Sequence, residues 1–324
     1  RAALNLSDSD IADFKAKGRI PHYRFLLDHS DVNWNDLVKG VSQYNMSNLS
    51  DPVIIREDGR VIYTLASVVD DIDFEVTDIL RGEDHMTNSA AQIQLFEALE
   101  SSPPNLGHLS LLTDISGAGL SKRIGSLSLR DLKNEGFQPM AIASLLSKVG
   151  TSDAVDIFKD INQIIFDFDI SKFGKSKPKF DKNELKGLNS KFFKLLDHAD
   201  IKDQLNIFDF KITSEFWELI KGNIDDLRDL ELWWNIIYGT IEPIQNDKNF
   251  INTALESLPE GKFDKNTWTS WTSLLIKETG RKGKELYNPI RMCLTGQNKG
   301  PEMATLVRLM GRDKVIERLT IKSL

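Results

Sequence analysis

The chain changes in character near Gly150, and no other feature of the sequence limits its fold as strongly. Before that point the sequence predicts a strand from about residue 74 to 80, a helix from about 89 to 100 and a short strand near 109–112. A strand, a helix and a strand in so short a stretch are typical of a βαβ unit in a parallel sheet. After Gly150 strand-like runs become scarce, and helical segments are separated by Gly, Asn, Asp and Pro. We therefore expect an α/β first half followed by an all-helical second half.

A hairpin is expected ahead of the βαβ unit. Strand-like runs at 53–55 and 61–63 flank Asp58-Gly59. This pair suits a tight two-residue turn because both of its positions can take a positive φ. The hairpin is interpreted as the end of an insertion rather than as a complete domain.

Apolar residues at helical spacing mark helices in both halves. Thr87 or Asn88 can cap the helix at 89–100, and Gly311 is the expected C-cap of a later one. Trp and Phe residues after position 190 are predicted to belong to the core rather than to a surface that stacks on bases. The apolar positions are Leu95, Phe96 and Leu99, then Leu232, Trp233, Ile236 and Ile237, and then Leu306, Val307 and Met310.

Length and composition indicate a soluble protein of two or three domains, because 324 residues exceed one ordinary core. No uncharged apolar run approaches the ~18 residues of a membrane span, so no membrane partner is expected. Cys293 is the only cysteine, which excludes an internal disulfide, and no Cys/His spacing predicts a zinc or other metal site. A reducing, cytoplasmic location is expected. The chain begins with Arg1 and no initiator Met, and we interpret it as a piece of a longer protein.

Charge is distributed unevenly along the chain. A net charge of −7 argues against a nucleic-acid partner, because polyanions are bound largely through Lys and Arg. Residues 172–194, however, contain eight lysines against Asp181 and Glu184, a local excess of six positive charges, and a second basic stretch covers 277–318. Each stretch is either a nucleic-acid contact or an ordinary solvated face.

Arg81 is the first residue whose position predicts chemistry. It should lie at the carboxyl end of a sheet strand, followed by Gly82, where open α/β sheets bind their ligands. A guanidinium there can hold a carboxylate with two parallel hydrogen bonds. The alternative is that Arg81 only stabilises its loop by pairing with Glu83, Asp84 or Asp78.

The second such place is the Ser121-Lys122-Arg123 triplet, which follows Gly117-Ala118-Gly119. A flexible backbone with cations suits close approach to phosphate. When a carboxylate attacks the α-phosphate of ATP, negative charge develops where Lys122 could reach it. Taken alone, such a triplet more often marks a solvated turn.

The motifs follow one another in an order and spacing that resemble a bacterial glutamyl-tRNA synthetase of class I. The resemblance extends from about residue 15 to the end of the chain. It rests in the first half on YTLASVVDD at 63–71, VTDILRGEDH at 76–85, HLSLL at 108–112 and LSKR at 120–123. In the second half it rests on FD at 180–181, LN at 188–189, GRKGK at 280–284, Pro289, Arg291, TG at 295–296 and GP at 300–301.

The resemblance implies the second half of a doubly wound, Rossmann-like catalytic domain followed by an α-helical anticodon-binding domain. The implied regions are 1–62, the end of an acceptor-binding insertion; 63–114, the second half of the nucleotide-binding domain; 115–187, a stem-contact region; and 188–324, the anticodon-binding domain. The implied activity is ATP-dependent activation of glutamate and transfer of the glutamyl group to the tRNA 3′ end.

Site residues carried over by resemblance fall into three groups. Tyr63 and Arg81 match positions that contact glutamate. Leu120, Ser121, Lys122 and Arg123 match the loop that closes over ATP, with Lys122 as the catalytic residue. Glu83 matches an acidic position near ATP or the tRNA terminus, whereas His85 is taken as structural. The implied partners are tRNA(Glu), L-glutamate and ATP with Mg²⁺, and the protein is expected to be a monomer.

Two departures from the family pattern affect the expected activity. The signature loop usually opens with lysine, and Gly119 stands there instead. The family's N-terminal Pro-Ser-Pro-Thr-Gly segment and His-x-Gly-His motif are absent, so the chain alone is expected not to catalyse ATP–pyrophosphate exchange. A catalytically inactive tRNA-binding fragment is therefore the alternative. Glutaminyl-tRNA synthetase, which ends in β-barrels, and a shortened relative that modifies a tRNA base both disagree with the helical second half.

Overall fold

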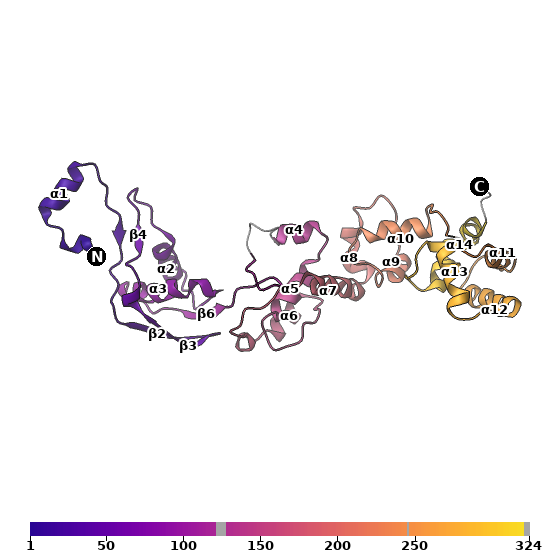
Figure 1. Cartoon of the computed structure of the whole chain (residues 1–324), viewed down its shortest axis with the longest axis horizontal. Coiled ribbons are helices and arrows are strands. Elements are labelled where there is room, and N and C mark those ends of the chain that lie inside the picture. The colour runs from indigo at the N-terminus through magenta and orange to yellow at the C-terminus, as the bar shows by residue number, and fades with distance from the viewer. Residues whose placement is uncertain (121–127, 245, 321–324) are drawn as a thin grey trace. The chain divides into compact units, whose positions relative to one another are not determined.

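The structure is a computed structural model of the chain and describes residues 1–120, 128–244 and 246–320 (Figure 1). The described residues form two compact units. The first comprises 1–120, 148–154 and 167–180, and the second comprises 128–147, 155–166, 181–244 and 246–320. The regions predicted from the sequence, with boundaries after 62, 114 and 187, stay predictions.

The first unit contains every named strand, and the strands form three separate pairs. Two pairs are antiparallel: β1 (Tyr23–Arg24) with β4 (Val53–Ile55), and β2 (Asp31–Asp36) with β3 (Gly40–Asn45). The third pair is parallel and joins β5 (Asp78–Gly82) to β6 (Asn105–Leu109). Three short elements precede or connect the strands: η1 (Ala2–Asn5), α1 (Asp8–Ala16) and η2 (Met46–Asn48).

The expected hairpin is present, but its turn differs from the prediction. Ile55 and Val61 form an antiparallel bridge, and the Arg56 N–H donates to the Arg60 carbonyl at 2.9 Å. Only Gly59 has a positive φ, at 80°, and its N–H donates to the Arg56 carbonyl. The connection is therefore a longer turn that ends in a left-handed glycine, because Asp58 keeps the negative φ that side chains prefer.

The predicted βαβ unit is confirmed by the parallel pairing of β5 and β6 across α3 (Met86–Ala98). Both strands are displaced from their predicted positions. The chain ahead of β5 belongs to α2 (Tyr63–Asp73). Phe74 is the C-cap of this helix, and Glu75 follows it with a positive φ. The prediction of a Thr87 or Asn88 cap is wrong, because η3 (Glu83–His85) leads directly into α3 and no side chain caps it.

Helix α3 lies at the centre of the first unit and is buried from two directions. One cluster packs Ala90, Ala91 and Ile93 against residues of the β2–β3 region and Leu106. Another packs Leu95 and Phe96 against Val68 of α2. Its buried positions also include three polar residues, Ser89, Gln92 and Gln94. Leu99, predicted as apolar core, is 46% exposed at the end of the helix.

The second unit is helical, as predicted, and no named strand lies in the described chain after Leu109. Short helices come first: α4 (Leu129–Asn134), α5 (Pro139–Lys148), α6 (Ile161–Asp167) and η4 (Ile170–Lys172), of which α5, α6 and η4 lie partly or wholly in segments of the first unit. The helices that follow are α7 (Lys182–Leu195), α8 (His198–Leu205), α9 (Ser214–Ile220), α10 (Asp229–Ile237), α11 (Lys248–Glu256), α12 (Thr267–Thr279), α13 (Lys284–Thr295) and α14 (Met303–Leu319).

One large apolar core joins helices α7 to α14. Trp217 and Trp271 are fully buried in it, which confirms that these aromatic residues belong to the core. The apolar stripe predicted in α10 is wrong at Leu232, because this side chain is 46% exposed. Leu230 packs in the core instead. Gly311 interrupts the helical conformation of α14 with a φ of 75°, so the break predicted there is confirmed.

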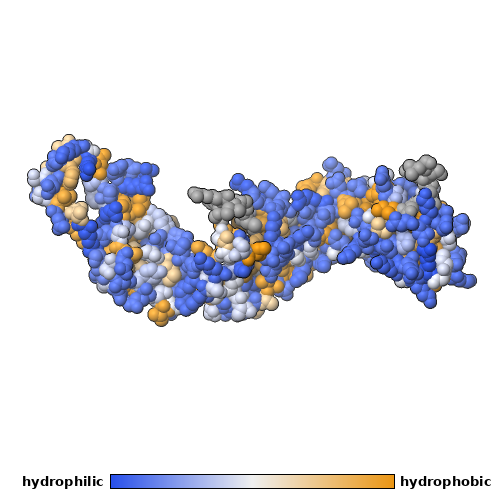
Figure 2. Space-filling model, viewed as in Figure 1, coloured by the Kyte–Doolittle hydropathy of each residue, from blue (hydrophilic) through white to orange (hydrophobic). Residues whose placement is uncertain are grey.

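The face of the chain drawn in Figure 2 is mostly hydrophilic, and its hydrophobic residues lie in small separate areas. Many of the larger apolar side chains are gathered in the core clusters of the two units, although some, such as Phe74 and Phe166, are exposed. Within the part of the chain that the structure describes, no helix has the length and apolar character needed to cross a membrane.

Candidate functional site

Arg81 lies near the carboxyl end of β5, as predicted, and pairs across the parallel ladder with His108 of β6. Its Nη1 group donates to the Tyr63 hydroxyl at 3.3 Å. Its Nη2 group donates to the Ser89 hydroxyl and, at 2.8 Å, to the Gln92 side-chain carbonyl. The structure therefore brings Arg81 and Tyr63 together. Glu83, Asp84 and Asp78, the alternative partners, form no ion pair with Arg81.

Two donors of the Arg81 guanidinium remain available. A guanidinium has five N–H bonds, and three of them are used by Tyr63, Ser89 and Gln92. One Nη1–H remains, and the buried Nε–H has no hydrogen-bond partner among the described residues. The Tyr63 side chain is exposed, and because its oxygen accepts from Arg81, its proton is free to be donated elsewhere. Adjacent N–H and O–H donors suit a carboxylate better than either would alone.

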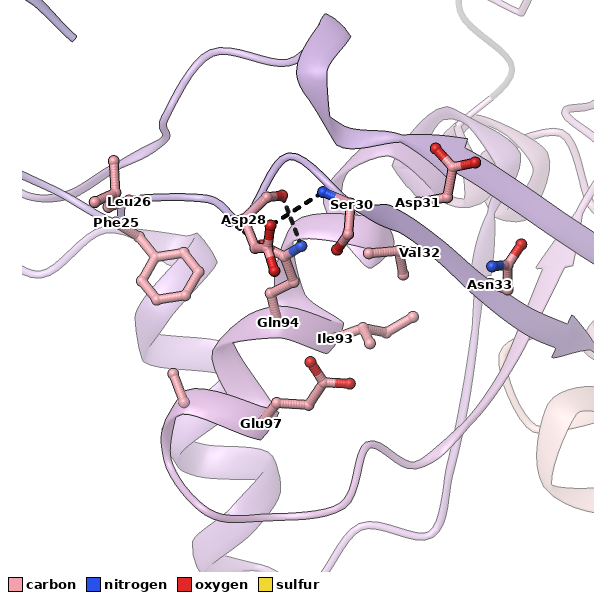
Figure 3. A pocket seen from close by; sticks show the side chains of 11 residues that line it. Phe25, Leu26, Asp28, Ser30, Asp31, Val32, Asn33, Ile93, Gln94 and Glu97 are labelled. Atoms are coloured by element: carbon pink, nitrogen blue, oxygen red, sulfur yellow. Dashed lines mark hydrogen bonds between the residues drawn. The ribbon is translucent and has the colours of Figure 1, made fainter.

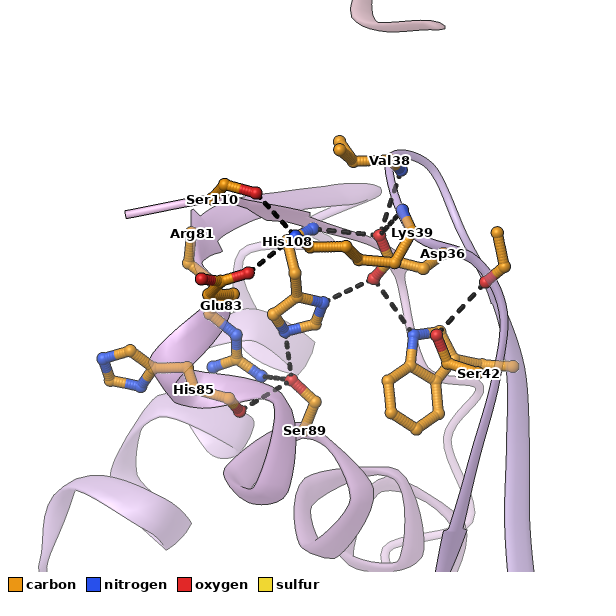
Figure 4. Close-up of polar contacts among 12 residues, drawn as sticks. Asp36, Val38, Lys39, Ser42, Arg81, Glu83, His85, Ser89, His108 and Ser110 are labelled. Atoms are coloured by element: carbon orange, nitrogen blue, oxygen red, sulfur yellow. Dashed lines mark hydrogen bonds and ion pairs between the residues drawn. The ribbon is translucent and has the colours of Figure 1, made fainter. Parts of the chain in front are cut away.

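A buried series of polar side chains lies behind Arg81 (Figure 4). The Ser89 hydroxyl is 2.6 Å from Nε2 of His108, and Nδ1 of His108 is bonded to the Asp36 carboxylate. Ser89 and His108 are fully buried, and Asp36 is 3% exposed. Burial would raise the pKa of Asp36, but hydrogen bonds from the His108 ring and from three backbone N–H groups outweigh it and lower that pKa to about 2. Asp36 is therefore an ionised carboxylate that only accepts.

Glu83 is committed to an ion pair rather than free to act as a base. Lys39 donates to its carboxylate at 2.6 Å and to the Ser110 hydroxyl at 2.7 Å (Figure 4). The Lys39 hydrogen bond lowers the pKa of Glu83, with a smaller contribution from the charge of Lys177. This corner of the unit thus combines one carboxylate with two lysines.

Most of the predicted ATP loop lies outside the part of the chain that the structure describes. Ser121, Lys122 and Arg123 lie outside the described residues. Leu120 is described and is 43% exposed. The glycine segment before it is a closed turn rather than a loose one, because the Asp114 N–H donates to the Ala118 carbonyl and the Asp114 carboxylate accepts from the Ser116 and Ala118 N–H groups.

A hollow of about 600 Å³ lies elsewhere in the first unit, between the segment leading into β2 and helix α3 (Figure 3). Three carboxylates line it, those of Asp28, Asp31 and Glu97. Gln94 closes one side by exchanging hydrogen bonds with the Asp28 backbone at 2.9 and 3.0 Å. Such a lining repels glutamate and phosphate, so the hollow is a poor candidate for either.

No metal centre is formed by the residues that the structure describes: no three or more His, Cys, Asp or Glu side chains are grouped so that they could hold an ion. The polar residues that sequence reasoning missed are Asp36, Lys39, Ser89 and Gln92. Ser89 and Gln92 had one usable signal, since residues at i and i+3 lie on the same face of a helix.

Comparison with known proteins covers most of the chain. Residues 1–187 match the catalytic-domain model "tRNA synthetases class I (E and Q)", and residues 240–322 match the "Anticodon binding domain" model. "Glutamate--tRNA ligase 1" of Maricaulis maris (strain MCS10) is 45% identical over 98% of this chain and 72% of its own length. "Glutamate--tRNA ligase 2" of Hyphomonas neptunium (strain ATCC 15444) is 44% identical over 99% of this chain and 73% of its own length.

A solved structure supports the fold. A glutamate tRNA ligase from Elizabethkingia meningosepticum CCUG26117, crystallised in complex with its amino acid, superposes with a TM-score of 0.79. That match covers 98% of this chain and 70% of the other at 20% identity, so it speaks for the fold alone. Taken with the two family models and the relatives above 40% identity, it means that this chain belongs to the glutamate–tRNA ligase family of class I tRNA synthetases.

Proposed function

We propose that this chain serves a glutamate–tRNA ligase, which activates L-glutamate with ATP and passes the glutamyl group to the 3′ end of tRNA(Glu). The observation that carries the proposal is Arg81 near the carboxyl end of β5, held by neutral partners and still able to donate. The family of the chain supports the same reading.

Glutamate binding would use two adjacent donors. The free Nη1–H of Arg81 and the Tyr63 O–H would both donate to one carboxylate of the substrate. Glutamine offers a neutral amide in that place, which accepts more weakly and has no charge to pair with the guanidinium. The geometry therefore favours the acid over its amide.

The activation step would form a bond from the glutamate α-carboxylate to the α-phosphorus of ATP and break the bond to pyrophosphate. A ribose hydroxyl at the tRNA 3′ end would then attack the activated carbonyl, and AMP would leave. We assign Lys122 to the phosphates, with Leu120, Ser121 and Arg123 beside it, because cations stabilise the charge that develops there. Glu83, paired with Lys39, would lie near the nucleotide or the tRNA end.

Mg²⁺ fits this scheme only as a companion of ATP. It would supply charge neutralisation on the phosphates. The described residues offer no cluster of acidic or histidine side chains to hold it independently. A monomeric state and a cytoplasmic location stay predictions, supported only by the composition of the chain.

Glutamate binding tests the proposal directly. Isothermal titration calorimetry of the chain with L-glutamate should give a binding isotherm that Arg81→Gln removes. Arg56→Gln is the matched control, because Arg56 is an exposed arginine of the same unit that belongs to no ion pair among the described residues. Equal affinity in the Arg81 and Arg56 variants would refute the assignment of Arg81.

A tRNA-binding module without adenylation activity is the second candidate. Lys175, Lys177 and Lys179 favour it, since all three are exposed and form no ion pair with a described residue. Glutamate-dependent ATP–pyrophosphate exchange separates the two candidates. A chain that binds tRNA(Glu) but shows no exchange would support the module and agree with the expectation from the missing N-terminal motifs, whereas a chain that shows both would support the ligase and overturn that expectation.

A further inference from the structure

The Arg81 guanidinium is the end of a buried hydrogen-bonded series that starts at Asp36, three side chains away. We propose that His108 is a positioning residue for glutamate recognition: held by Asp36, it fixes the Ser89 hydroxyl as an acceptor that orients Arg81. The inference rests on the proposed function, because it assumes that Arg81 binds the substrate carboxylate. None of the three side chains would touch glutamate themselves.

The placement of protons along the series follows from its two ends. Asp36 is ionised and accepts, so Nδ1 of His108 carries a proton and donates to it. In the neutral ring Nε2 then has a lone pair and accepts the single proton of the Ser89 hydroxyl, because Nε2 lies 2.6 Å away and the other acceptor, the His85 carbonyl, lies 3.1 Å away. With its proton directed at His108, the Ser89 oxygen presents its lone pairs to Arg81, which can only donate.

The arrangement also preserves the charge of Arg81. A carboxylate in direct contact would orient the guanidinium equally well but would neutralise it. Here the direct partners Ser89, Gln92 and Tyr63 are all neutral. The negative charge of Asp36 is separated from Arg81 by the side chains of His108 and Ser89. The carboxyl of Asp71, whose pKa is raised by burial, an effect that the charge of Arg81 partly offsets, forms no ion pair with Arg81. Arg81 is thus held in one orientation while its positive charge remains for the substrate.

Backbone contacts make Asp36 a rigid anchor for the series. Its Oδ1 accepts from the N–H groups of Val38, Lys39 and His108 at 2.9–3.0 Å, and its Oδ2 accepts from the Trp34 ring N–H at 3.2 Å (Figure 4). The end of β2 and strand β6 are therefore linked through one carboxylate. Because β6 also pairs with β5, the same strands set the position of the Arg81 backbone.

The first experiment removes the acceptor. Ser89→Ala should raise the dissociation constant for L-glutamate about tenfold, as expected when a charged donor loses one partner. Ser42→Ala is the matched control, because Ser42 is also a buried serine of the first unit whose hydroxyl has only a backbone partner, the Gly40 carbonyl. The proposal requires a weaker affinity in the Ser89 variant at a similar thermal midpoint. Equal affinity in both variants would overturn it.

The second experiment separates positioning from packing at His108. His108→Gln places an amide oxygen near Nε2 and keeps an acceptor for Ser89, whereas His108→Asn keeps a donor for Asp36 and loses that acceptor. If positioning holds, the Gln variant binds glutamate more tightly than the Asn variant even where their thermal midpoints agree. Affinities that simply follow the thermal midpoints, or that rank in the opposite order, contradict the proposal.

The outcomes also distinguish the two levels of inference. Loss of glutamate binding in Arg81→Gln with no effect of Ser89→Ala would leave the proposed function intact and remove the positioning role. A wild-type chain that does not bind glutamate would overturn both. Weaker glutamate binding in Ser89→Ala, together with no glutamate binding in Arg81→Gln and unchanged affinity in the controls, would support the proposed function and the positioning role.

Discussion

At the scale of single residues, the chain places its unusual side chains in the buried series behind Arg81 rather than on the exposed surface. Asp36 is the clearest case, because it is a nearly fully buried carboxylate whose pKa lies near 2. A buried charge is costly unless hydrogen bonds replace its hydration, and here four N–H groups and a histidine ring do so. Its ionisation is therefore coupled to folding.

Acid should weaken the fold through Asp36. Its pKa falls from 3.8 to about 2 on folding, so its ionised form stabilises the protein above pH 3.8, and that contribution is lost as the pH falls toward 2. The shift corresponds to about 2 kcal/mol. Urea unfolding of wild type and Asp36→Asn should therefore differ by about that amount at pH 6 and converge between pH 4 and 2. A difference independent of pH would contradict this account.

Lys122 is expected to act on the activation step rather than on glutamate binding. In a protein that also carries the family's N-terminal ATP-binding motifs, Lys122→Ala should lower kcat of ATP–pyrophosphate exchange by about 10²-fold or more, as for other groups that stabilise transition-state charge. KM for glutamate should change little. Lys133→Ala, at an exposed lysine of α4, is the control. Parallel losses in kcat and glutamate affinity would indicate misfolding instead.

At the scale of elements, the start of α11 shows how one side chain joins two helices. Asp247 caps α11 by accepting from the Phe250 N–H at 3.1 Å. It also accepts from Arg281, just beyond α12, at 2.7 Å, and the Arg281 guanidinium lies 4.4 Å above the Phe250 ring. The hydrogen bond from Arg281 lowers the pKa of Asp247. Cap, ion pair and cation–π contact therefore depend on the same carboxylate.

Replacing this cap should separate its two roles. Asp247→Ala should lower the free energy of unfolding by about 1–2 kcal/mol, because it removes both the cap and the partly exposed ion pair. Asp247→Asn keeps an oxygen acceptor for Phe250 and should lose less than half of that. Chemical denaturation followed by circular dichroism measures both, and equal losses would mean that the cap contributes nothing.

At the scale of the whole molecule, the net charge of −7 conceals an uneven distribution. Of the lysines between 172 and 194, three pair with carboxylates: Lys172 with Asp153, Lys182 with Glu135 and Lys186 with Asp225. The others are exposed without such a partner among the described residues. A carboxylate partner offsets the charge of a paired lysine, so the unpaired lysines present more net positive charge to a polyanion, and the basic stretch is not uniform.

Binding to tRNA should follow that division. Changing Lys175, Lys177 and Lys179 to Gln should weaken tRNA(Glu) binding and reduce the slope of log K against log[salt] by about 1 for each phosphate that is no longer neutralised. The matched control changes Lys172, Lys182 and Lys186 to Gln, three exposed lysines that are already paired. Filter binding across a salt series measures both. Identical slopes in the two triple variants would exclude Lys175, Lys177 and Lys179 as phosphate-binding residues.

Patterns of period and glycine positions predicted several of the main elements, although not strands β2 and β3. The parallel βαβ unit, the helical second half and the break at Gly311 are all confirmed, because apolar spacing and glycine act within a few residues. Boundaries were less predictable. The strand predicted from 74 begins at Asp78, and Leu230 rather than Leu232 is buried in the core. Strand ends and helix faces both depend on packing against neighbouring elements, which the local sequence does not contain.

Arg81 and Tyr63 were identifiable from local sequence, since a strand end and a motif mark them, although their roles remain predictions. The side chains behind Arg81 were not. Asp36, Ser89 and His108 lie on β2, α3 and β6 and are far apart in the chain. Only folding brings them within hydrogen-bonding distance, and only burial gives a carboxylate and a hydroxyl the power to orient a charge. Local sequence thus specified the main helical and βαβ elements and the donors Arg81 and Tyr63, while tertiary packing decided which neutral groups hold Arg81.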